Sequence, residues 1–397
     1  MTYYNKIKLG NEDYFKLIMG QSPPSETYNA EGKGLPFLQG KAEFGDTYPN
    51  TTLFCSSPLK IAEKNDILIS VRAPVGDVNI ANAKSCIGRG ISAIRPNSEK
   101  VDYLYLFYYL RKNENIFDSL SSGSTFKSIR TYELSNFEVL LPPLPVQRKI
   151  AEILGAADAA IEKVDQAIAA TERLKKGLMQ QLLTKGIGHT QFKNTELGKI
   201  PKEWELVRLG ELGTLQYGYT ETSTTVNTGC KYLRITDIES NGIVKWDSVP
   251  FCKIDGNNYN KYNLEKGDLL FARIGSTTGK SCFIDKNIKG VFASYLIRFR
   301  PTVAVNQKYL FYYSQTLFYW NQANKNKEGQ LKKGINAPIL KSINIILPTV
   351  AEQNMIVTGI DSFNDKLAIL TAKINSISAI KHKLMTDLLT GKRSVKV

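Results

Sequence analysis

The feature that most constrains the fold of this chain is a long heptad pattern that occurs twice. From Ile150, and again from Ile356, apolar or helix-neutral residues recur at steps of four and three, which is the spacing of a coiled-coil seam. Adding 206 to each position of the first copy gives the second copy without a gap. The predicted seam residues are Ile150, Leu154, Ile161, Val164, Ile168, Leu174, Leu178, Leu182, Ile356, Ile360, Phe363, Leu367, Leu370, Ile374, Ile377, Ile380, Leu384 and Leu388.

The segments that precede the two heptad patterns also match each other. Val207–Gly210 resembles Ile7–Gly10, and Tyr309–Tyr313 resembles Tyr105–Tyr109, with an offset that drifts from 200 towards 206 along the chain. Loops tolerate changes of length, whereas one inserted residue rotates every later side chain of a helix by about 100°. The sequence therefore predicts a tandem duplication in which each copy is a globular unit followed by a long helix.

Prolines define where the first long helix begins. Leu141-Pro-Pro-Leu-Pro145 suits neither a sheet nor a helix interior, so we expect it to end a strand and to start a helix over about 146–185, which Gly186 stops. Such a helix would be about 60 Å long and cannot bury its apolar stripe alone. Approximate two-fold symmetry favours antiparallel pairing with the second helix, which starts from the shorter segment Leu347–Gln353. Thr171 is the one polar seam position, and it is predicted to mark either a packing defect or a contact.

The expected fold class is α+β. It consists of two similar mixed α/β units separated by two long helices that form an antiparallel coiled coil, with an internal pseudo-two-fold duplication. The length of 397 residues suits two such units. The chain has no apolar run of about 18 residues and no signal-peptide core, which predicts a cytoplasmic protein without membrane spans.

The net charge and the pattern of possible metal ligands limit the classes of function. Lysine and arginine number 52 against 37 acidic residues, a net charge of +15 that favours polyanionic partners such as nucleic acids. A merely basic soluble protein is the alternative explanation. The five scattered cysteines and two histidines form no metal-binding pattern, so we expect no metal and mostly buried, reduced thiols.

The motifs that would indicate catalysis fail when they are examined residue by residue. Gly275-Ser-Thr-Thr-Gly-Lys-Ser281 has one residue too few between its glycines for a nucleotide-binding P-loop, and a strand, not a helix, is expected after it. A surface turn is the better interpretation, with phosphate contacts through Arg72, Arg273 and Lys280. No methyltransferase motif is present, and His189 and His382 are expected to face solvent. The chain is therefore predicted to have no catalytic residues of its own.

Two polar and basic loops at equivalent positions are better candidates for binding DNA. Gly123–Arg130 and Gly329–Asn336 each precede the last strand of their unit, and Lys127 and Lys333 are in register. Such loops can place amide, hydroxyl and basic groups against phosphates and base edges, although ordinary solvated loops are the alternative. The predicted DNA-binding residues, including an aromatic and basic cluster of the second unit, are Lys33, Gln39, Lys41, Arg72, Ser124, Thr125, Lys127, Arg130, Tyr217, Tyr219, Lys231, Arg234, Arg273, Lys280, Gln330, Lys332, Lys333 and Asn336.

Three segments resemble the specificity (S) subunit of type I restriction–modification systems. They are Leu141–Leu154, Leu174–Gly186 and Leu197–Leu206. The resemblance covers essentially the whole chain. It implies a first target-recognition domain at residues 1–141, a central conserved helical region at 142–187, a linker with a second target-recognition domain at 188–347, and a C-terminal conserved helical region at 348–397.

The resemblance also implies partners and a mechanism. Each target-recognition domain would read one half of a bipartite double-stranded DNA target, and the helices would act as a ruler, so that one added helical turn shifts the spacer by about one or two base pairs. The S subunit would have no cofactor itself. It would assemble with two methyltransferase (M) subunits, which use S-adenosylmethionine to methylate adenine N6, and with restriction (R) subunits, which use ATP and Mg²⁺. Polar helix positions Glu162, Lys163, Lys175 and Lys176 are candidate M-subunit contacts, or simply a solvated face.

The sequence is also compatible with two other functions. One is the recognition subunit of a type II-like restriction enzyme, and the other is a coiled-coil adaptor that binds protein instead of DNA. The DNA target and its spacer length do not follow from the sequence, because base readout depends on the geometry of the loops.

Overall fold

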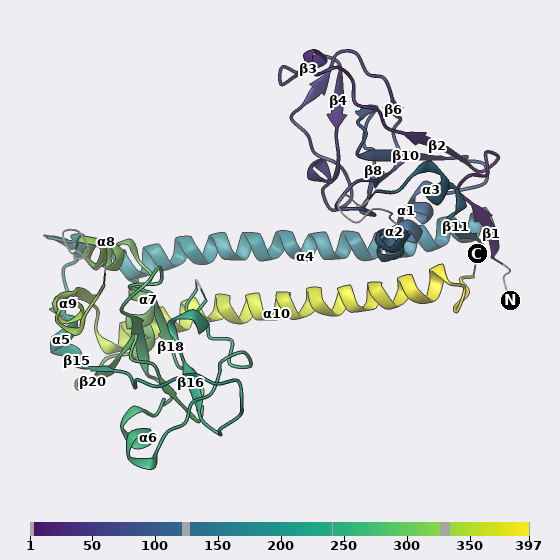
Figure 1. Cartoon of the computed structure of the whole chain (residues 1–397). Helices are drawn as coiled ribbons and strands as arrows, with labels where there is room; N and C mark the ends of the chain where they lie inside the picture. The colour runs from purple at the N-terminus through teal and green to yellow at the C-terminus, as the bar shows by residue number, and fades with distance from the viewer. Residues whose placement is uncertain (1–3, 121–127, 240, 326–333, 397) are drawn as a thin grey trace. The chain divides into compact units, whose positions relative to one another are not determined.

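The computed structural model divides the chain into two compact units. It describes residues 4–120, 128–239, 241–325 and 334–396. Unit 1 is Met1–Gln166 with Leu370–Val397, and unit 2 is Ala167–Ile369. Two long helices, α4 (Leu144–Lys185) and α10 (Val350–Leu389), each contribute residues to both units. Each unit also contains one globular part, which we call head 1 (residues 4–141) and head 2 (residues 190–347) (Figure 1).

Head 1 is built on two sheets. The first has the order β2-β10-β7-β8 and is antiparallel, and the second has the order β3-β5-β4-β9-β6 with β4 and β9 parallel. The strands of these sheets are β2 (Phe15–Met19), β3 (Tyr28–Asn29), β4 (Leu35–Leu38), β5 (Phe54–Cys55), β6 (Ile61–Ala62), β7 (Ile67–Ser70), β8 (Val78–Ile80), β9 (Ser85–Ile87) and β10 (Ile91–Pro96). The other elements are β1 (Asn5–Lys8), paired with β11 (Glu138–Leu141), helices α1 (Tyr103–Lys112), α2 (Glu114–Leu120) and α3 (Thr131–Asn136), and the 3-10 turns η1 (Ser25–Thr27) and η2 (Lys41–Glu43).

Head 2 repeats this plan. Its main sheet has the order β15-β20-β17-β18, and β16 pairs in parallel with β19, as β4 pairs with β9 in head 1. The strands are β14 (Glu205–Arg208), paired with β21 (Asn344–Leu347), β15 (Gly213–Tyr217), β16 (Lys231–Leu233), β17 (Leu269–Ala272), β18 (Ser281–Phe283), β19 (Gly290–Phe292) and β20 (Leu296–Pro301). The helices are α5 (Leu209–Leu212), η3 (Ile235–Asp237), α6 (Gly256–Tyr262), α7 (Gln307–Tyr313), α8 (Leu317–Lys325) and α9 (Ala337–Ser342), and the hairpin β12 (Phe192–Thr195) and β13 (Gly198–Pro201) precedes them.

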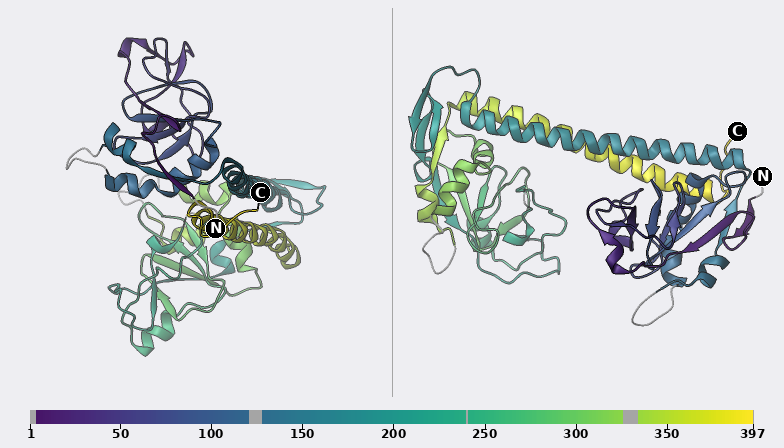
Figure 2. Two further views of the ribbon diagram at one scale, coloured as in Figure 1. Left: turned by 90° about the vertical axis from the view of Figure 1, so that its right-hand side faces the viewer. Right: turned by 90° about the horizontal axis from the view of Figure 1, so that it is seen from above.

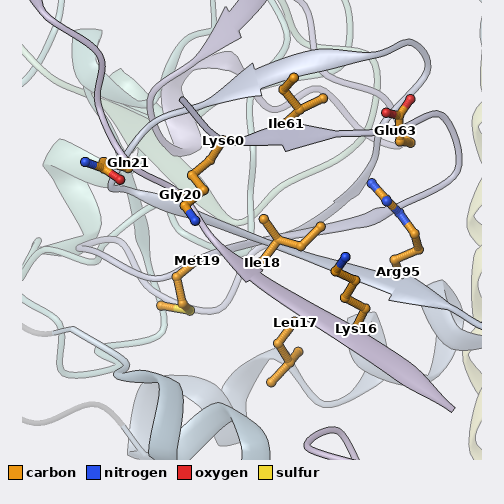
Figure 3. Close-up of a pocket in the computed structure, with 10 residues that line it drawn as sticks. All are labelled: Lys16, Leu17, Ile18, Met19, Gly20, Gln21, Lys60, Ile61, Glu63 and Arg95. Carbon is orange, nitrogen blue, oxygen red and sulfur yellow. The ribbon is translucent and has the colours of Figure 1, made fainter. Parts of the chain in front are cut away.

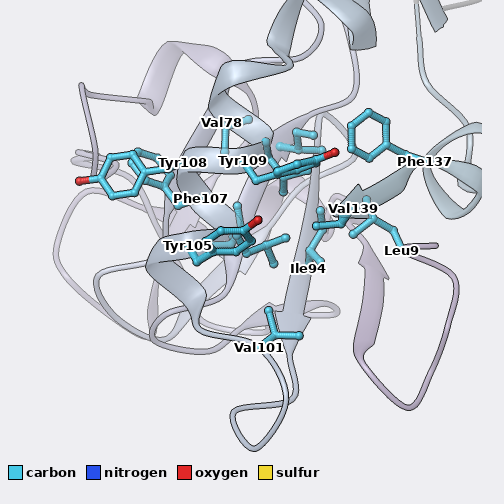
Figure 4. Close-up of a cluster of buried hydrophobic side chains, with 14 of the residues drawn as sticks. Leu9, Val78, Ile94, Val101, Tyr105, Phe107, Tyr108, Tyr109, Phe137 and Val139 are labelled. Carbon is cyan, nitrogen blue, oxygen red and sulfur yellow. The ribbon is translucent and has the colours of Figure 1, made fainter. Parts of the chain in front are cut away.

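An aromatic helix packs on the main sheet of each head. In α1, every residue from Tyr105 to Leu110 is buried (Figure 4). Burying a tyrosine requires a partner for its hydroxyl group. The hydroxyl of Tyr105 donates to the carbonyl of Leu140 at 2.6 Å, and that of Tyr309 in α7 donates to the carbonyl of Ile346 at 2.6 Å. The same bond thus ties the aromatic helix to the last strand in both heads.

A buried glutamine fixes the start of each long helix. The amide group of Gln147 donates to the carbonyls of Pro142 and Lys100 at 2.8 and 3.0 Å, and its oxygen accepts the backbone N–H of Asp102 at 2.9 Å. Gln147 is only 1% exposed, and its N–H acceptors and C=O donor belong to head 1 and to the proline segment. Asp102 is the N-cap of α1, so the glutamine joins the beginnings of two helices.

The second copy has the same clamp despite its shorter proline segment. Gln353 donates to the carbonyl of Pro348 at 2.8 Å and accepts the N–H of Asn306, the N-cap of α7, at 2.8 Å. The helices α4 and α10 begin at Leu144 and Val350, which are 206 positions apart. Thr349 stands where the first copy has Pro143, and its hydroxyl accepts the N–H of Glu352 at 3.3 Å. A side-chain cap therefore replaces a proline without shifting the start of the helix.

The two long helices pack against each other in antiparallel fashion within each unit. In unit 1, Ile150 and Leu154 near the start of α4 share a core with Leu388 and Leu389 at the end of α10. The N-terminal strand lies beside the same helix end (Figure 2), and the hydroxyl of Tyr4 donates to the carbonyl of Leu388 at 2.8 Å. In unit 2, the end of α4 meets the start of α10. Leu183, Ile356 and Ile360 share the core of head 2 there.

A tyrosine, an aspartate and a lysine join three elements of unit 1. The hydroxyl of Tyr108 in α1 donates to the carboxylate of Asp158 in α4 at 2.6 Å, and the ammonium of Lys381 in α10 donates to the same carboxylate. In unit 2, Tyr312 donates to Asp361 of α10. Burial first, and then its hydrogen bond to the carboxylate, raises the pKa of each of these tyrosines, so both remain protonated donors at neutral pH.

Two predicted seam positions were wrong. Leu174 is 62% exposed and Ile380 is 58% exposed, because strict alternation of four and three continues from Thr171 to Lys175 and from Ile377 to Lys381, one residue later. They are equivalent positions in the two helices, because they are 206 residues apart. The residues at the strict heptad positions, Lys175 and Lys381, are partly buried. Most of the other seam residues are buried or partly buried.

Thr171 packs on the seam without leaving an unpaired polar group. It is buried, and its hydroxyl donates to the carbonyl of Ala167, one turn earlier, at 2.7 Å. Threonine commonly satisfies its hydroxyl in this way within a helix. The polar seam position is therefore not a packing defect.

His189 was expected to face solvent, and this expectation was wrong. Its imidazole lies 2.9 Å from a carboxylate oxygen of Glu352, which is buried at the start of α10. The same carboxylate accepts the indole N–H of Trp204 at 2.8 Å and the backbone N–H of Ile187 at 3.0 Å. The linker after α4 is thus folded onto the first turn of α10, a contact that sequence spacing does not reveal.

The cysteines are buried, as the sequence predicted. All five cysteines are buried and free. Burial raises the pKa of Cys86 to about 12 and that of Cys252 to about 12, so these thiols stay protonated at neutral pH. In the described part of the chain, no three His, Cys, Asp or Glu side chains are grouped as metal ligands would be. Nor does any described helix combine the length and apolar character needed to span a bilayer.

The glutamine clamp yields a stability prediction. We expect Gln147→Ala to lower the free energy of unfolding by about 3 kcal/mol, because the buried N–H of Asp102 and the carbonyl of Pro142 lose their partner. Urea unfolding followed by circular dichroism measures this as a lower midpoint. The matched control is Gln166→Ala on the exposed face of the same helix, where we expect a change within about 0.5 kcal/mol. Equal effects of the two substitutions would contradict the clamp.

Candidate nucleic-acid interface

In head 2, three of the predicted residues meet at the end of β15. The guanidinium of Arg273 lies over the ring of Tyr217, 4.9 Å from its centroid. The hydroxyl of Tyr217 accepts the backbone N–H of Ala337 at 3.0 Å, and the carbonyl of Arg273 accepts the N–H of Ile335 at 2.8 Å. The segment that leads into α9, with Asn336 at its N-cap, is therefore held against the turn that contains Arg273. From the sequence, the turn that contains Arg273 and the loop that ends at Asn336 were predicted as separate candidate sites.

A tight backbone crossing completes this surface. The N–H of Arg273 donates to the carbonyl of Tyr295 at 3.0 Å, and its guanidinium donates to the carbonyl of Ser294 at 3.4 Å. Gly218 lies where β15 ends, and a Cβ at that position would be only 2.2 Å from the carbonyl oxygen of Ala293. Only glycine permits the two backbones to come this close. The crossing brings Tyr217, Arg273 and Tyr295 onto one surface, with Tyr217 40% exposed and Tyr295 50% exposed.

Head 1 has the same backbone frame with different side chains. The carbonyl of Val71 accepts the N–H of Ile129 at 3.0 Å, and the N–H of Val71 donates to the carbonyl of Gly90 at 2.9 Å, as Arg273 does with Ile335 and Tyr295. Gly20 occupies the position of Gly218, with the same close approach to a carbonyl oxygen.

Three arginines are attached to the frame of head 1. They are Arg72, Arg89 and Arg130. All three are exposed, and none forms an ion pair with another described residue. Head 1 therefore presents three exposed guanidinium groups where head 2 presents two tyrosines and one arginine. Guanidinium groups bind phosphate and guanine edges, whereas aromatic rings stack and pack.

Several predicted residues of head 1 have partners within the chain. The ammonium of Lys41 lies 2.7 Å from the carboxylate of Asp77, and that of Lys33 lies 2.6 Å from Glu31. Both lysines remain exposed, so these pairs are weak and can be exchanged for a phosphate. Gln39 is exposed, and its backbone N–H donates to the carboxylate of Glu43 at 3.1 Å.

In head 2, the predicted residues Lys231 and Arg234 form contacts within the chain. Arg234 makes hydrogen bonds of 2.8 and 3.1 Å to the carboxylate of Asp237, and these bonds raise the pKa of Arg234. The ammonium of Lys231 donates to the carbonyl of Val249 at 2.7 Å and lies over the ring of Phe251. A DNA contact by either side chain would require these bonds to be given up.

The remaining predicted residues of head 2 lie nearer the frame. The ring of Tyr219 packs on the ring of Tyr262, with 5.4 Å between the centroids. The backbone carbonyl of Tyr219 accepts the N–H of Ser294. The side chain of Asn336 caps α9 by accepting the N–H of Ile339 at 2.9 Å. Lys280 ends the turn between β17 and β18, which confirms that the glycine-containing motif of this region is a turn between strands. The predicted residues Ser124, Thr125, Lys127, Gln330, Lys332 and Lys333 lie outside the described part of the chain.

Two residues of this surface were missed by the sequence analysis. They are Arg89, within Gly88-Arg-Gly90, and Tyr295, which follows β19. Both lie on the connection that leads into the central strand of the main sheet, β10 or β20. The match between Ala93–Pro96 and Arg298–Pro301 aligns these connections. What the sequence did not show is that the connection crosses the end of β2 or β15.

The comparison with protein families identifies the class of protein. The profile described as "Type I restriction modification DNA specificity domain" matches residues 7–172 and 201–379. These two matches cover most of the chain and fall on its two copies. The chain belongs to this family, and it is a DNA specificity subunit of a type I restriction–modification system.

Individual relatives agree with this assignment. The MjaVIII type I restriction enzyme specificity subunit of Methanocaldococcus jannaschii is 29% identical over 98% of this chain and 93% of its own length. A candidate MjaX specificity subunit of the same organism is 53% identical, over 45% of this chain and 42% of its own length. The crystal structure of a type I S subunit from M. genitalium shares the fold, with a TM-score of 0.60 over 98% of this chain and 96% of that one, at 15% identity.

The backbone crossing yields a prediction for head 2. We expect Gly218→Ala to destabilise unit 2 by about 3 kcal/mol or more, because the added methyl would clash with backbone that cannot move alone. The control is Gly177→Ala in α4, where no atom lies near the new methyl, and where we expect stabilisation of up to about 1 kcal/mol. Thermal unfolding of both variants measures the contrast. A Gly218→Ala variant as stable as Gly177→Ala would show that the crossing is not rigid.

Proposed function

We propose that each head reads one half of a bipartite double-stranded DNA target, through the surface at the end of β2 in head 1 and of β15 in head 2. The observation that carries this proposal is a shared backbone frame with unlike side chains. A pair of readers derived from one ancestor needs a conserved support and a variable surface. Head 1 presents Arg72, Arg89 and Arg130 on that support, and head 2 presents Tyr217, Arg273 and Tyr295.

The chemistry of these side chains suits DNA. The three arginines of head 1 have no acidic partners among the described residues, so their charge is available for phosphates or guanine edges. In head 2 the ring of Tyr217 holds the guanidinium of Arg273 in one orientation by a cation–π contact. An oriented guanidinium discriminates between bases better than a mobile one, because its two donors must match two acceptors.

We propose that the two long helices serve as a spacer and as the docking platform for two methyltransferase (M) subunits. Their support is the exposure of Leu174 and Ile380 at equivalent positions of α4 and α10. Exposed apolar side chains at symmetric positions suit two copies of one partner. The polar positions Glu162, Lys163 and Lys176 are exposed and suit the rim of such a contact, whereas Lys175 is partly buried.

The catalytic chemistry is assigned to the partners. S-adenosylmethionine would bind to the M subunits, and ATP and Mg²⁺ to the restriction (R) subunits. This chain would supply recognition and geometry.

Variants of the two heads should change different halves of the target. We expect Arg72→Ala/Arg89→Ala to relax recognition of one half-site and Tyr217→Ala/Arg273→Ala to relax the other. Methylome sequencing of cells that express the chain with its methyltransferase subunit maps both halves at once. Lys193→Ala, on the hairpin β12–β13, is the control and should leave the map unchanged. Loss of the same half in both double variants would refute two independent readers.

The spacer proposal has its own test. Inserting one heptad in α4 after Gln166 and one in α10 after Ile369 keeps the seam in register and adds about 10 Å, or about three base pairs. We expect the methylome to show the same two half-sites with a spacer longer by about three base pairs. An insertion in α4 alone is the control, since it breaks the register and should abolish methylation. An unchanged spacer in the double insertion would eliminate the ruler.

A further inference from the structure

Head 1 contains an open groove between the edges of its two sheets. The groove has a volume of about 650 Å³ and lies between β2, the terminal strand of the main sheet, and β6, the terminal strand of the second sheet. Figure 3 shows Lys16, Ile18 and Ile61 along it, with Gln21 and Lys60 towards one end and Arg95 towards the other. At Gly20 the groove adjoins the frame that carries Arg72 and Arg130.

In head 2, two polar side chains close the position that is equivalent to this groove. The registers of the main sheets align Ile18 and Ala93 of head 1 with Gln216 and Arg298 of head 2. In head 2 the guanidinium of Arg298 is buried, and it donates to the carbonyls of Asn263 and Lys261 at 2.5 and 3.2 Å. Gln216 donates to the same carbonyl of Lys261 at 3.1 Å. Two long polar side chains therefore fasten the two sheet edges of head 2 together.

Head 1 has no such fastening because its two side chains are short and apolar. The adjoining segment is also shorter. Residues 56–60 connect β5 to β6, where head 2 has a longer connection that includes α6. The neighbouring ion pair is present in both heads, with Arg95 bonded to Asp66 at 2.9 and 2.8 Å and Arg300 bonded to Asp268. The two heads therefore share this ion pair and differ in the side chains that fasten the groove beside it.

The groove exposes a strand edge that has no partner. In an antiparallel pair, alternate residues turn both backbone groups towards the neighbouring strand. Gly20 donates to the carbonyl of Ile91, so Ile18 and Lys16 share its phase, and Leu17 and Met19 direct their N–H and C=O groups away from β10. No described residue pairs with those outward groups. An exposed edge of this kind is a template for an added strand.

The charge of the groove selects the chemistry of that strand. Arg95 is neutralised by Asp66, and Glu63 by Lys84 at 3.0 Å. Lys16 and Lys60 form no ion pair with the described part of the chain, and both are exposed. Two unpaired ammonium groups beside an apolar floor of Ile18 and Ile61 favour a ligand that alternates acidic and apolar side chains.

We propose that this groove is a docking site for an extended, acidic segment of a partner protein, which adds to the free edge of β2. The backbone of the segment would pair with Leu17 and Met19, its apolar side chains would cover Ile18 and Ile61, and its carboxylates would meet Lys16 and Lys60. A phosphodiester chain matches this surface less well, because it has no N–H groups for the strand edge and no apolar side chains for the floor. The groove runs along β2, and it adjoins the proposed DNA surface of head 1 at Gly20.

An array of immobilised peptides tests the proposal with the full-length chain. The probes are extended peptides of about eight residues in which Glu or Asp alternates with Val, Ile, Leu or Phe. The matched probes carry Lys in place of the acidic residues, or N-methyl groups on alternate amides, which remove the strand-forming donors. We expect the chain to bind a subset of the acidic peptides and none of the matched probes. Fluorescence anisotropy then gives the dissociation constant of the best peptide.

Two sets of variants locate the binding. Lys16→Glu/Lys60→Glu should weaken the best peptide by about tenfold or more. Lys6→Glu/Lys8→Glu on β1 makes the same change of net charge elsewhere on head 1 and should leave the affinity within about twofold. Ile18→Gln/Ala93→Arg, which copies the fastening of head 2, should also abolish binding. The charge-reversal pair keeps the test decisive if this last variant does not fold.

Other results would overturn the proposal. Failure of every acidic peptide to bind would do so, as would equal loss in the Lys16→Glu/Lys60→Glu and Lys6→Glu/Lys8→Glu variants. Displacement of the bound peptide by a short DNA duplex, with loss of duplex binding in Lys16→Glu/Lys60→Glu, would instead make the groove part of the nucleic-acid surface.

Discussion

The buried amides of Gln147 and Gln353 are the contacts on which the rest of the architecture depends. Each amide satisfies backbone groups of the head and of the proline segment at once, and so fixes the first turn of a long helix relative to the first turn of an aromatic helix. A single rotatable bond between head and helix would leave the direction of the head undefined. A buried amide with fixed donors and acceptors removes that freedom, because every alternative orientation leaves polar groups unpaired in the core.

The two heads show how recognition can diverge on such a support. Backbone hydrogen bonds from Ile129 to Val71 and from Ile335 to Arg273 hold equivalent segments in equivalent places. Val71, Ile129 and Ile335 on those segments are buried in the cores, whereas the neighbouring side chains of Arg72, Arg89 and Arg130 are exposed and are free to change. The groove beside β2 likewise shows side chains changing on a shared backbone. Replacing the pair Gln216 and Arg298 by Ile18 and Ala93 leaves the sheet intact and changes only what its edge can bind.

Much of this architecture was predictable from the sequence, because it rests on periodicity. The heptad stripes, the 206-residue register and the aromatic helices all appear as patterns, and the structure contains them. Leu174 and Ile380 were wrongly predicted to lie on the seam because they are apolar, although the strict heptad positions are those of Lys175 and Lys381. The contacts of His189, Arg89 and Tyr295 were not predicted for another reason. Their roles depend on which loops cross in space, and nothing local to those residues records the crossing.

Each unit combines residues from both copies of the duplicated chain, and this has a consequence for synthesis. The core of head 1 includes Leu388 and Leu389, and the hydroxyl of Tyr4 is bonded to the carbonyl of Leu388. Domains commonly fold in the order in which the ribosome releases them. Here the head that is made first keeps an apolar surface uncovered until the last helix has been translated. The first domain to be synthesised is therefore the last to be completed, and a chain that terminates early loses part of its first head as well as its end.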